Sequence, residues 1–87
     1  MTTATVSQES KIENTVFMLL KEIAPEANPR SLDRDVDVRY ELDIDSFDFL
    51  EFLIALEKEL NVSVPESDYG KLVSLNDIFT YLQQRLQ

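Results

Sequence analysis

The residue types in this chain that could do chemistry gather at positions 45 to 48, Asp-Ser-Phe-Asp, where one serine stands between acids. A long apolar run at positions 49 to 56 follows, and this pattern predicts that the stretch begins a helix. A serine in a first helical turn is often hydrogen-bonded to nearby backbone and has only a structural role. The alternative is a hydroxyl that is held out for covalent modification.

The chain lacks the residues that usually activate such a hydroxyl. It contains no His and no Cys, which removes the commonest general base, thiolate nucleophiles, disulfides and cysteine metal sites. Its single Gly leaves no glycine-rich phosphate loop. We therefore expect a protein that is not an enzyme, with a serine that reacts only when another enzyme supplies the base.

A second acidic group, Asp33, Asp35 and Asp37, occupies alternate positions and resembles the start of a calcium-binding loop. Val38 stands where that loop needs a glycine, and Ile44 stands where it needs a bidentate glutamate. A solvated acidic loop is the preferred interpretation, and no metal site is predicted. Loose binding of divalent cations stays open.

The charge of the chain limits its partners. With 17 acidic against 8 basic residues, the net charge is −9, which repels nucleic acids and anionic membrane surfaces and favours basic patches on other proteins. No apolar run reaches the roughly 18 residues of a membrane span, and the first ten residues lack the pattern of a signal peptide. We expect a cytoplasmic monomer that binds no nucleic acid and does not insert into membranes.

Two helices and the loop between them are expected to position the serine. Ser10 and Glu13 have the spacing of a capping box, with Ser7 as an alternative start, so residues 1–6 are predicted to be a disordered tail. Apolar residues then recur at helical spacing as far as Pro25. They are Ile12, Val16, Leu19, Leu20 and Ile23.

Between residues 25 and 43, Pro25, Asn28 and Pro29 indicate a loop. The apolar residues from Val36 to Ile44 alternate with polar ones as in a strand, but no second strand is available to pair with them, and several of them are expected to pack in the core. A long ordered loop is therefore predicted there. Asp45 and Asp48 then cap the second helix, which should end at Leu60 or Asn61.

The second helix is apolar nearly all round, and so small a protein cannot enclose it on every side. Some of Phe47, Leu50 and Ile54 are expected to be exposed as a protein contact. Nine further apolar residues of the second half of the chain are assigned to the core. They are Phe52, Leu53, Leu56, Leu60, Leu72, Leu75, Ile78, Phe79 and Leu82.

A short third helix is predicted from Glu66 to about Tyr69, and Ser74 with Asp77 starts a last helix that ends near Leu86. The predicted fold is all-α: a small four-helix bundle with three main helices plus a short third helix, and a long loop between helices one and two. The whole chain, 1–87, is expected to be a single domain.

At this point the sequence resembles a known family, the acyl carrier proteins. The likeness covers about residues 10–86 and rests on the Asp-Ser-Phe-Asp stretch through Glu51, on residues 55–57, on Val64-Pro65 and on the helix spacing. The resemblance implies that Ser46 carries phosphopantetheine in a phosphodiester, which makes the chain a phosphoprotein. A separate phosphopantetheinyl transferase takes the group from coenzyme A. The thiol of the arm then holds acyl groups as thioesters, and partner enzymes perform every chemical step.

The resemblance also implies a recognition face for acyl-transferring and synthase enzymes with basic patches. Its members are Asp45, Phe47, Asp48, Leu50, Glu51, Ile54 and Glu57. Two residues depart from the family pattern, Phe47 in place of the usual Leu and Ile44 in place of the usual Gly. These departures favour a specialised carrier over the housekeeping carrier of fatty acid biosynthesis.

The function expected is that of a free-standing acyl carrier protein in fatty acid metabolism or in a specialised lipid or polyketide pathway. A peptidyl or aminoacyl carrier is one alternative, although carriers of that type tend to be less acidic. The other is an acidic helical adaptor that binds proteins without being modified at Ser46.

Overall fold

A computed structural model describes the backbone of residues 4–86 and the side chains of residues 10–86. This part of the chain contains helices and no strand, which confirms the all-α prediction. None of its helices is both long and apolar enough to cross a membrane. The elements in order are α1 (Ala4–Ile23), η1 (Pro29–Ser31), α2 (Val38–Leu42), α3 (Ser46–Leu60), η2 (Glu66–Lys71) and α4 (Leu75–Arg85), of which η1 and η2 are 3₁₀ helices.

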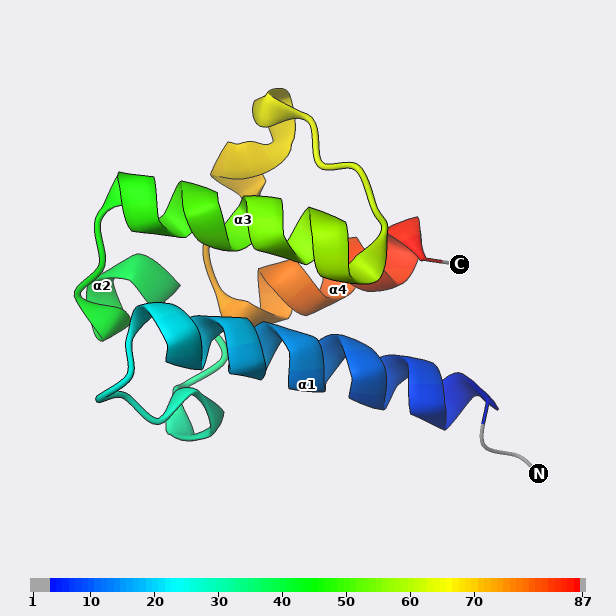
Figure 1. Ribbon diagram of the computed structural model, residues 1–87, viewed down its shortest axis with the longest axis horizontal. Coiled ribbons are helices and arrows are strands. Elements are labelled where there is room, and N and C mark those ends of the chain that lie inside the picture. Colours follow the sequence, from blue (N-terminus) through cyan, green and yellow to red (C-terminus); the bar gives the residue numbers. More distant parts are fainter. Residues whose placement is uncertain (1–3, 87) are drawn as a thin grey trace.

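The three long helices pack around one core (Figure 1). Helices α1 and α3 lie side by side and run in opposite directions, and α4 packs against α1. Helix α2 lies beside the start of α3, whereas η2 projects at the opposite side of α3 from α1. The N-terminus of α3 therefore sits at one end of the molecule, next to the connection that follows α1.

The predicted ends of α3 and α4 are confirmed, except that the side chain of Asp48 forms no hydrogen bond back to the amide of Asp45. The side chain of Asp45 accepts a hydrogen bond from the backbone amide of Asp48 at 2.9 Å, and Asn61 ends α3 in the left-handed conformation with φ 55°. At α4, Ser74 and Asp77 form both hydrogen bonds of a capping box, each at 3.1 Å.

The predicted start of the first helix is wrong. Helix α1 already includes Ala4, so Ser10 and Glu13 lie inside it and form no N-terminal cap. Of the predicted tail, residues 4–6 belong to α1, while residues 1–3 lie outside the described part of the chain. Helix η2 likewise continues through Gly70 to Lys71, beyond the predicted end near Tyr69.

The connection between α1 and α3 is a loop only in part, because η1 and α2 form within it. Asp37 starts α2 by accepting the backbone amide of Arg39 at 2.9 Å, and Asp43 ends it in the left-handed conformation. Val38 and Leu42 point into the core, and the amide of Val38 donates to the carbonyl of Val73 at 3.0 Å. That bond comes from a distant segment, so the apolar alternation alone could not indicate a helix.

All nine predicted core residues of the second half of the chain are buried. Phe17 is an additional core residue, and its ring meets that of Phe79 edge to face at 5.8 Å. Val38 and Leu42 are buried, as expected for several apolar residues of the connection, and Phe49 and Val64 are buried residues that the sequence did not single out.

Arginine side chains fasten the connection to this core. Arg30 lies over the ring of Phe17 at 4.7 Å and Arg34 lies over the ring of Phe79 at 5.1 Å. Arg39 does the same over Phe49 at 5.5 Å. These contacts help to explain how a long connection with few regular hydrogen bonds takes one conformation in front of α3.

Candidate functional site

Ser46 is the first residue of α3 and is exposed to solvent. Its hydroxyl has no hydrogen-bond partner among the described residues, because Asp45 supplies the cap at this helix end. The structural alternative, a serine hydrogen-bonded to nearby backbone, is thus not what the structure has. The hydroxyl is open to a reagent that approaches from solvent.

The helix terminus around Ser46 suits a phosphate ester. The first amides of a helix have no intrahelical acceptor, and the positive end of the helix dipole lies there. The side chain of Asp45 accepts a hydrogen bond from the amide of Asp48, and its carbonyl accepts one from the amide of Phe49. The amides of residues 46 and 47 have no acceptor among the described residues. Asp45 and Asp48 also bring negative charge, which favours an arm that projects into solvent over one that docks on the helix.

The apolar residues predicted for the recognition face differ in exposure. Phe47 is 64% exposed and Ile54 is 42% exposed, while Leu50 is half-buried. The aromatic neighbours of Phe47 on α3, Phe49 and Phe52, are buried. The side chain that follows Ser46 is therefore exposed to solvent, whereas the other two phenylalanines of α3 belong to the core.

The acids predicted for this face are not equivalent. Asp45, Asp48 and Glu51 form no ion pair with any described residue. Glu57 is half-buried, and its Oε2 accepts the backbone amide of Val64 at 2.7 Å. Glu57 thus fastens the chain that leaves α3, a role that its place in the sequence did not indicate.

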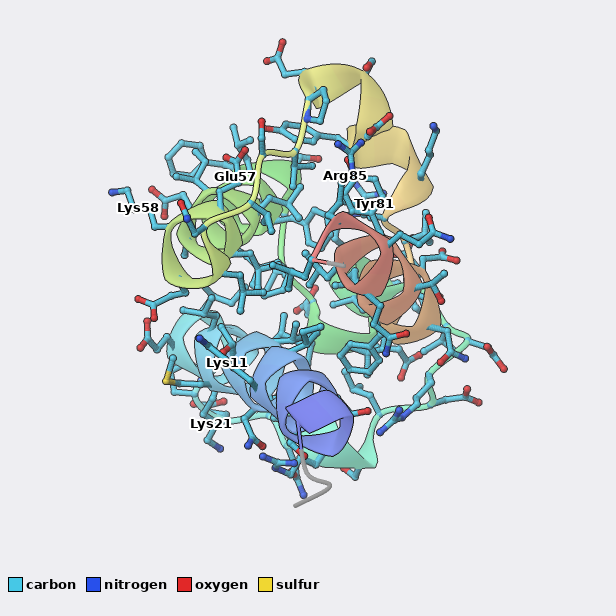
Figure 2. All side chains as sticks on the ribbon, turned by 90° about the vertical axis from the view of Figure 1, so that its right-hand side faces the viewer. Lys11, Lys21, Glu57, Lys58, Tyr81 and Arg85 are labelled. Carbon is cyan, nitrogen blue, oxygen red and sulfur yellow. The ribbon has the colours of Figure 1, made fainter. Side chains whose placement is uncertain are left out.

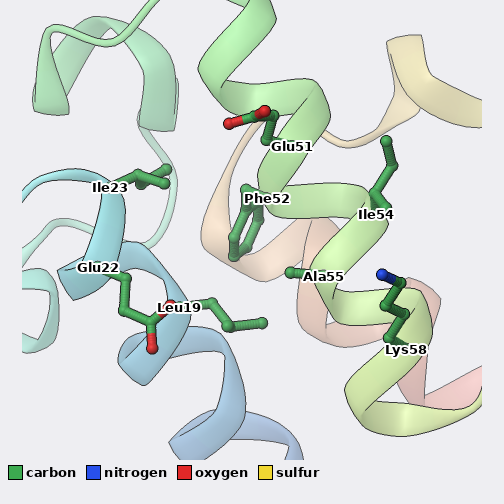
Figure 3. A pocket seen from close by; sticks show the side chains of 8 residues that line it. All are labelled: Leu19, Glu22, Ile23, Glu51, Phe52, Ile54, Ala55 and Lys58. Carbon is green, nitrogen blue, oxygen red and sulfur yellow. The ribbon is translucent and has the colours of Figure 1, made fainter.

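A groove of about 360 Å³ opens between α1 and α3, and we call it the α1–α3 groove (Figure 3). Leu19 and Phe52 form its buried floor, and Ile23 and Ala55 form its half-buried walls. Its charged edge consists of Glu22 on α1 and of Glu51 and Lys58 on α3. Two of the lining residues, Glu51 and Ile54, were predicted from the sequence as partner contacts, and the others were not.

A second hollow of about 530 Å³ lies between the end of α1, α2 and the start of α3. Ile23, Leu42 and Ile44 contribute apolar surface to it. Its acidic lining residues are Glu26, Glu41, Asp43 and Asp48. The concentration of negative charge near Ser46 is therefore higher than α3 alone would give.

Each aspartate of the acidic loop before α2 accepts a hydrogen bond. Asp33 accepts the amide of Asp35 at 2.9 Å, Asp35 accepts the side-chain amide of Asn76 at 2.7 Å, and Asp37 caps α2. Among residues 10–86 no three such side chains gather in a way that could hold a metal ion. Asp35 thus ties the connection to α4, whereas Asp33 and Asp37 stabilise the connection itself.

A polar cluster ties η2 to α4 on the far side of the molecule from the α1–α3 groove (Figure 2 labels Tyr81 and Arg85). Asp68 accepts the hydroxyl of Tyr81 at 2.6 Å and pairs with Arg85 at 2.9 Å and Lys71 at 3.2 Å. The hydrogen bond from Tyr81, followed by that from Lys71, lowers the pKa of Asp68. Burial and the same hydrogen bond to Asp68 raise the pKa of Tyr81.

Comparison with known proteins identifies the family of the chain. A family model described as a phosphopantetheine attachment site matches residues 14–82. An acyl carrier protein of Campylobacter hominis is 33% identical over 55 residues, which cover 63% of this chain and 70% of that protein. An acyl carrier protein of Rickettsia bellii is 29% identical over 77 residues, which cover 86% of this chain and 95% of that protein.

These matches define a class, the proteins that carry covalently bound phosphopantetheine. Within that class this chain belongs to the acyl carrier protein family. Members of this family are carriers and not enzymes.

Proposed function

We propose that Ser46 is the residue that carries phosphopantetheine and that this chain delivers acyl groups to partner enzymes in the cytoplasm. The observation that carries the proposal is the exposed hydroxyl of Ser46, free of hydrogen bonds to the described residues, at the N-terminus of α3. The family match supports it, because it extends across this position.

The chain provides the hydroxyl and its surroundings, and the transferase provides the activation. Asp45 is committed to the amide of Asp48, so it is poorly placed to serve as a base for Ser46. No His or Cys is available in the chain. The transferase must therefore remove the proton of the hydroxyl and stabilise the phosphate of coenzyme A as it is transferred.

The surface around Ser46 supports recognition by basic enzymes. Asp45, Asp48 and Glu51 present carboxylates without ion-pair partners among the described residues, and Phe47 and Ile54 add exposed apolar area beside them. An Arg or Lys patch with an apolar centre complements this face. Phe47 stands where the family resemblance leads us to expect Leu, so a specialised lipid or polyketide pathway is favoured over housekeeping fatty acid biosynthesis.

The proposal is tested by incubating the full chain with coenzyme A, Mg²⁺ and a broad-specificity phosphopantetheinyl transferase, followed by intact mass measurement. One added phosphopantetheine is expected on the wild type and none on Ser46→Ala. Addition that persists in Ser46→Ala would assign the arm to another residue. An unmodified wild type would favour the adaptor, whose partners bind regardless of the state of Ser46.

A further inference from the structure

We propose that the α1–α3 groove receives the helix of a partner enzyme that carries an apolar side chain between a basic and an acidic residue. This inference rests on the proposed function, because it names the chemistry of a partner of the same carrier. It differs from the recognition face of α3 in requiring an acid on the partner and in using α1.

The groove offers apolar surface from two helices at once. In Figure 3, Leu19 of α1 and Ala55 of α3 point toward each other, and Phe52 lies between the helices. Leu19 and Phe52 are already buried, so a side chain entering the groove would lie on them and against Ile23 and Ala55. Such a contact removes apolar surface from water without opening the core.

The charged edge of the groove is what specifies the occupant. Lys58 forms no ion pair or hydrogen bond with any described residue, and Figure 2 shows it at the outer edge of α3. Glu51 also forms no ion pair with any described residue, and it lies nearer to Ser46 along α3 than Lys58 does. The net charge of −9 makes an exposed lysine among acids a distinctive mark of this surface.

The two charges have a spacing that a helix can match. Glu51 and Lys58 are seven residues apart on α3, or about 10 Å along the helix axis, since each residue rises about 1.5 Å. A partner helix that lies along the groove presents side chains at i and i+7 over the same distance, with i+3 and i+4 between them. An Arg at i, Leu at i+3 and i+4 and Glu at i+7 would therefore meet Glu51, the groove and Lys58.

Two other occupants fit the surface less well. The arm on Ser46 would have to wrap around α3, because Ala55 is nine residues, about two and a half turns, beyond Ser46. An acyl chain would also gain nothing from Glu22, Glu51 and Lys58 at the edge. A second copy of this chain would bring another net charge of −9 against the first, which opposes association.

The test uses the full chain, ¹⁵N-labelled and carrying phosphopantetheine, and two helix-stabilised synthetic peptides. The matched peptide has Arg, Leu, Leu and Glu at i, i+3, i+4 and i+7, and the all-basic peptide has Arg in place of that Glu. Their dissociation constants are measured by NMR titration against wild type, Lys58→Glu and a control, Lys11→Glu. Lys11 is exposed on α1 and does not line the groove, so the control makes the same charge change elsewhere.

The wild type is expected to bind the matched peptide about threefold tighter than the all-basic one, which is the strength of one exposed ion pair. Lys58→Glu should reverse this order, whereas Lys11→Glu should keep it. The amide shifts should centre on Ile23, Ala55 and Lys58. The same order in wild type and Lys58→Glu, or shifts confined to α4, would overturn the proposal.

The other occupants give different results in the same experiment. Displacement of the matched peptide by loading an octanoyl group on the arm would overturn the proposal in favour of the cargo. A concentration-dependent dimer that Lys58→Glu abolishes would overturn it in favour of a second copy. Intact mass of the same samples reports modification at Ser46 separately, so a failure of the groove proposal leaves the carrier proposal standing, and the reverse also holds.

Discussion

The carboxylate of Asp45 accepts a hydrogen bond from the backbone amide of Asp48 at 2.9 Å, and Ser46 stands between these two residues with its hydroxyl free of described partners. The acid before the serine thus does the capping that the serine itself could have done. This division explains how a serine at a helix start can remain available to an enzyme in solution.

Replacement of Asp45 tests whether this residue stabilises α3 by accepting a hydrogen bond as its cap or only through its charge. Asp45→Ala is expected to lower the free energy of unfolding by about 1 kcal/mol, because the amide of Asp48 loses its acceptor. Asp45→Asn keeps an acceptor oxygen and should stay close to wild type. Urea denaturation followed by circular dichroism measures both, and equal losses in the two variants would contradict the capping role.

Tyr81→Phe should destabilise the protein in a pH-dependent way. In the folded chain the pKa of Asp68 lies below its ordinary value of 3.8, chiefly because Tyr81 donates to its carboxylate. A depressed folded pKa contributes stability that is complete above the unfolded pKa and is lost as the pH falls through the folded pKa. The urea midpoint of Tyr81→Phe should thus lie below wild type at pH 7, and the gap should narrow below about pH 4.

The matched control for that experiment is Tyr40→Phe. Tyr40 is 82% exposed and its hydroxyl has no hydrogen-bond partner among the described residues, so the loss of the hydroxyl should leave the midpoint unchanged at every pH. A gap between wild type and Tyr81→Phe that stays constant down to pH 3 would show that the ionisation of Asp68 is not involved.

The phenylalanines of α3 should separate into core and surface residues. Phe52 is 1% exposed, and Phe52→Ala should cost about 3–5 kcal/mol, a large share of the stability of so small a domain. Phe47 is 64% exposed, and Phe47→Ala should change stability by no more than about 0.5 kcal/mol. Chemical denaturation measures both. Comparable losses at the two positions would mean that Phe47 packs in the fold.

The charge of α3 should govern the encounter with the transferase. Glu51→Gln is expected to raise the KM of modification about twofold to fivefold at low salt and to weaken its salt dependence, because one acid is removed from the face near Ser46. Glu66→Gln removes the same charge from η2 and serves as the control. Steady-state kinetics at several salt concentrations would contradict this account if the two variants behaved alike.

Much of the architecture follows from local sequence signals. Asp45, Asn61 and the Ser74–Asp77 pair mark helix ends through bonds made within a few residues, and each was predictable. Helix α2 was not, because Val38 is held by the carbonyl of Val73, a long-range partner. The spacing of Val38 and Leu42, with Asp37 before them, is the one local signal that could have indicated it.

Features of the candidate site that depend on α3 alone could be predicted from the sequence, whereas features formed by two helices could not. The exposure of Phe47 and Ile54 follows from the apolar circumference of α3. The α1–α3 groove arises only when Leu19 and Ile23 pack beside Ala55, so no single stretch of sequence contains it. The bond from Val64 to Glu57 likewise depends on how the chain folds back after α3.

The central claim is that Ser46 carries the arm, and the most direct measurement maps the modified residue. The chain is treated with coenzyme A and the transferase, digested, and sequenced by tandem mass spectrometry, with Ser46→Ala and Ser67→Ala in parallel. Ser67 is an exposed serine on η2 and provides the matched control. The account predicts phosphopantetheine on Ser46 in wild type and Ser67→Ala and none in Ser46→Ala; an arm found on any other residue, or retained in Ser46→Ala, would contradict it.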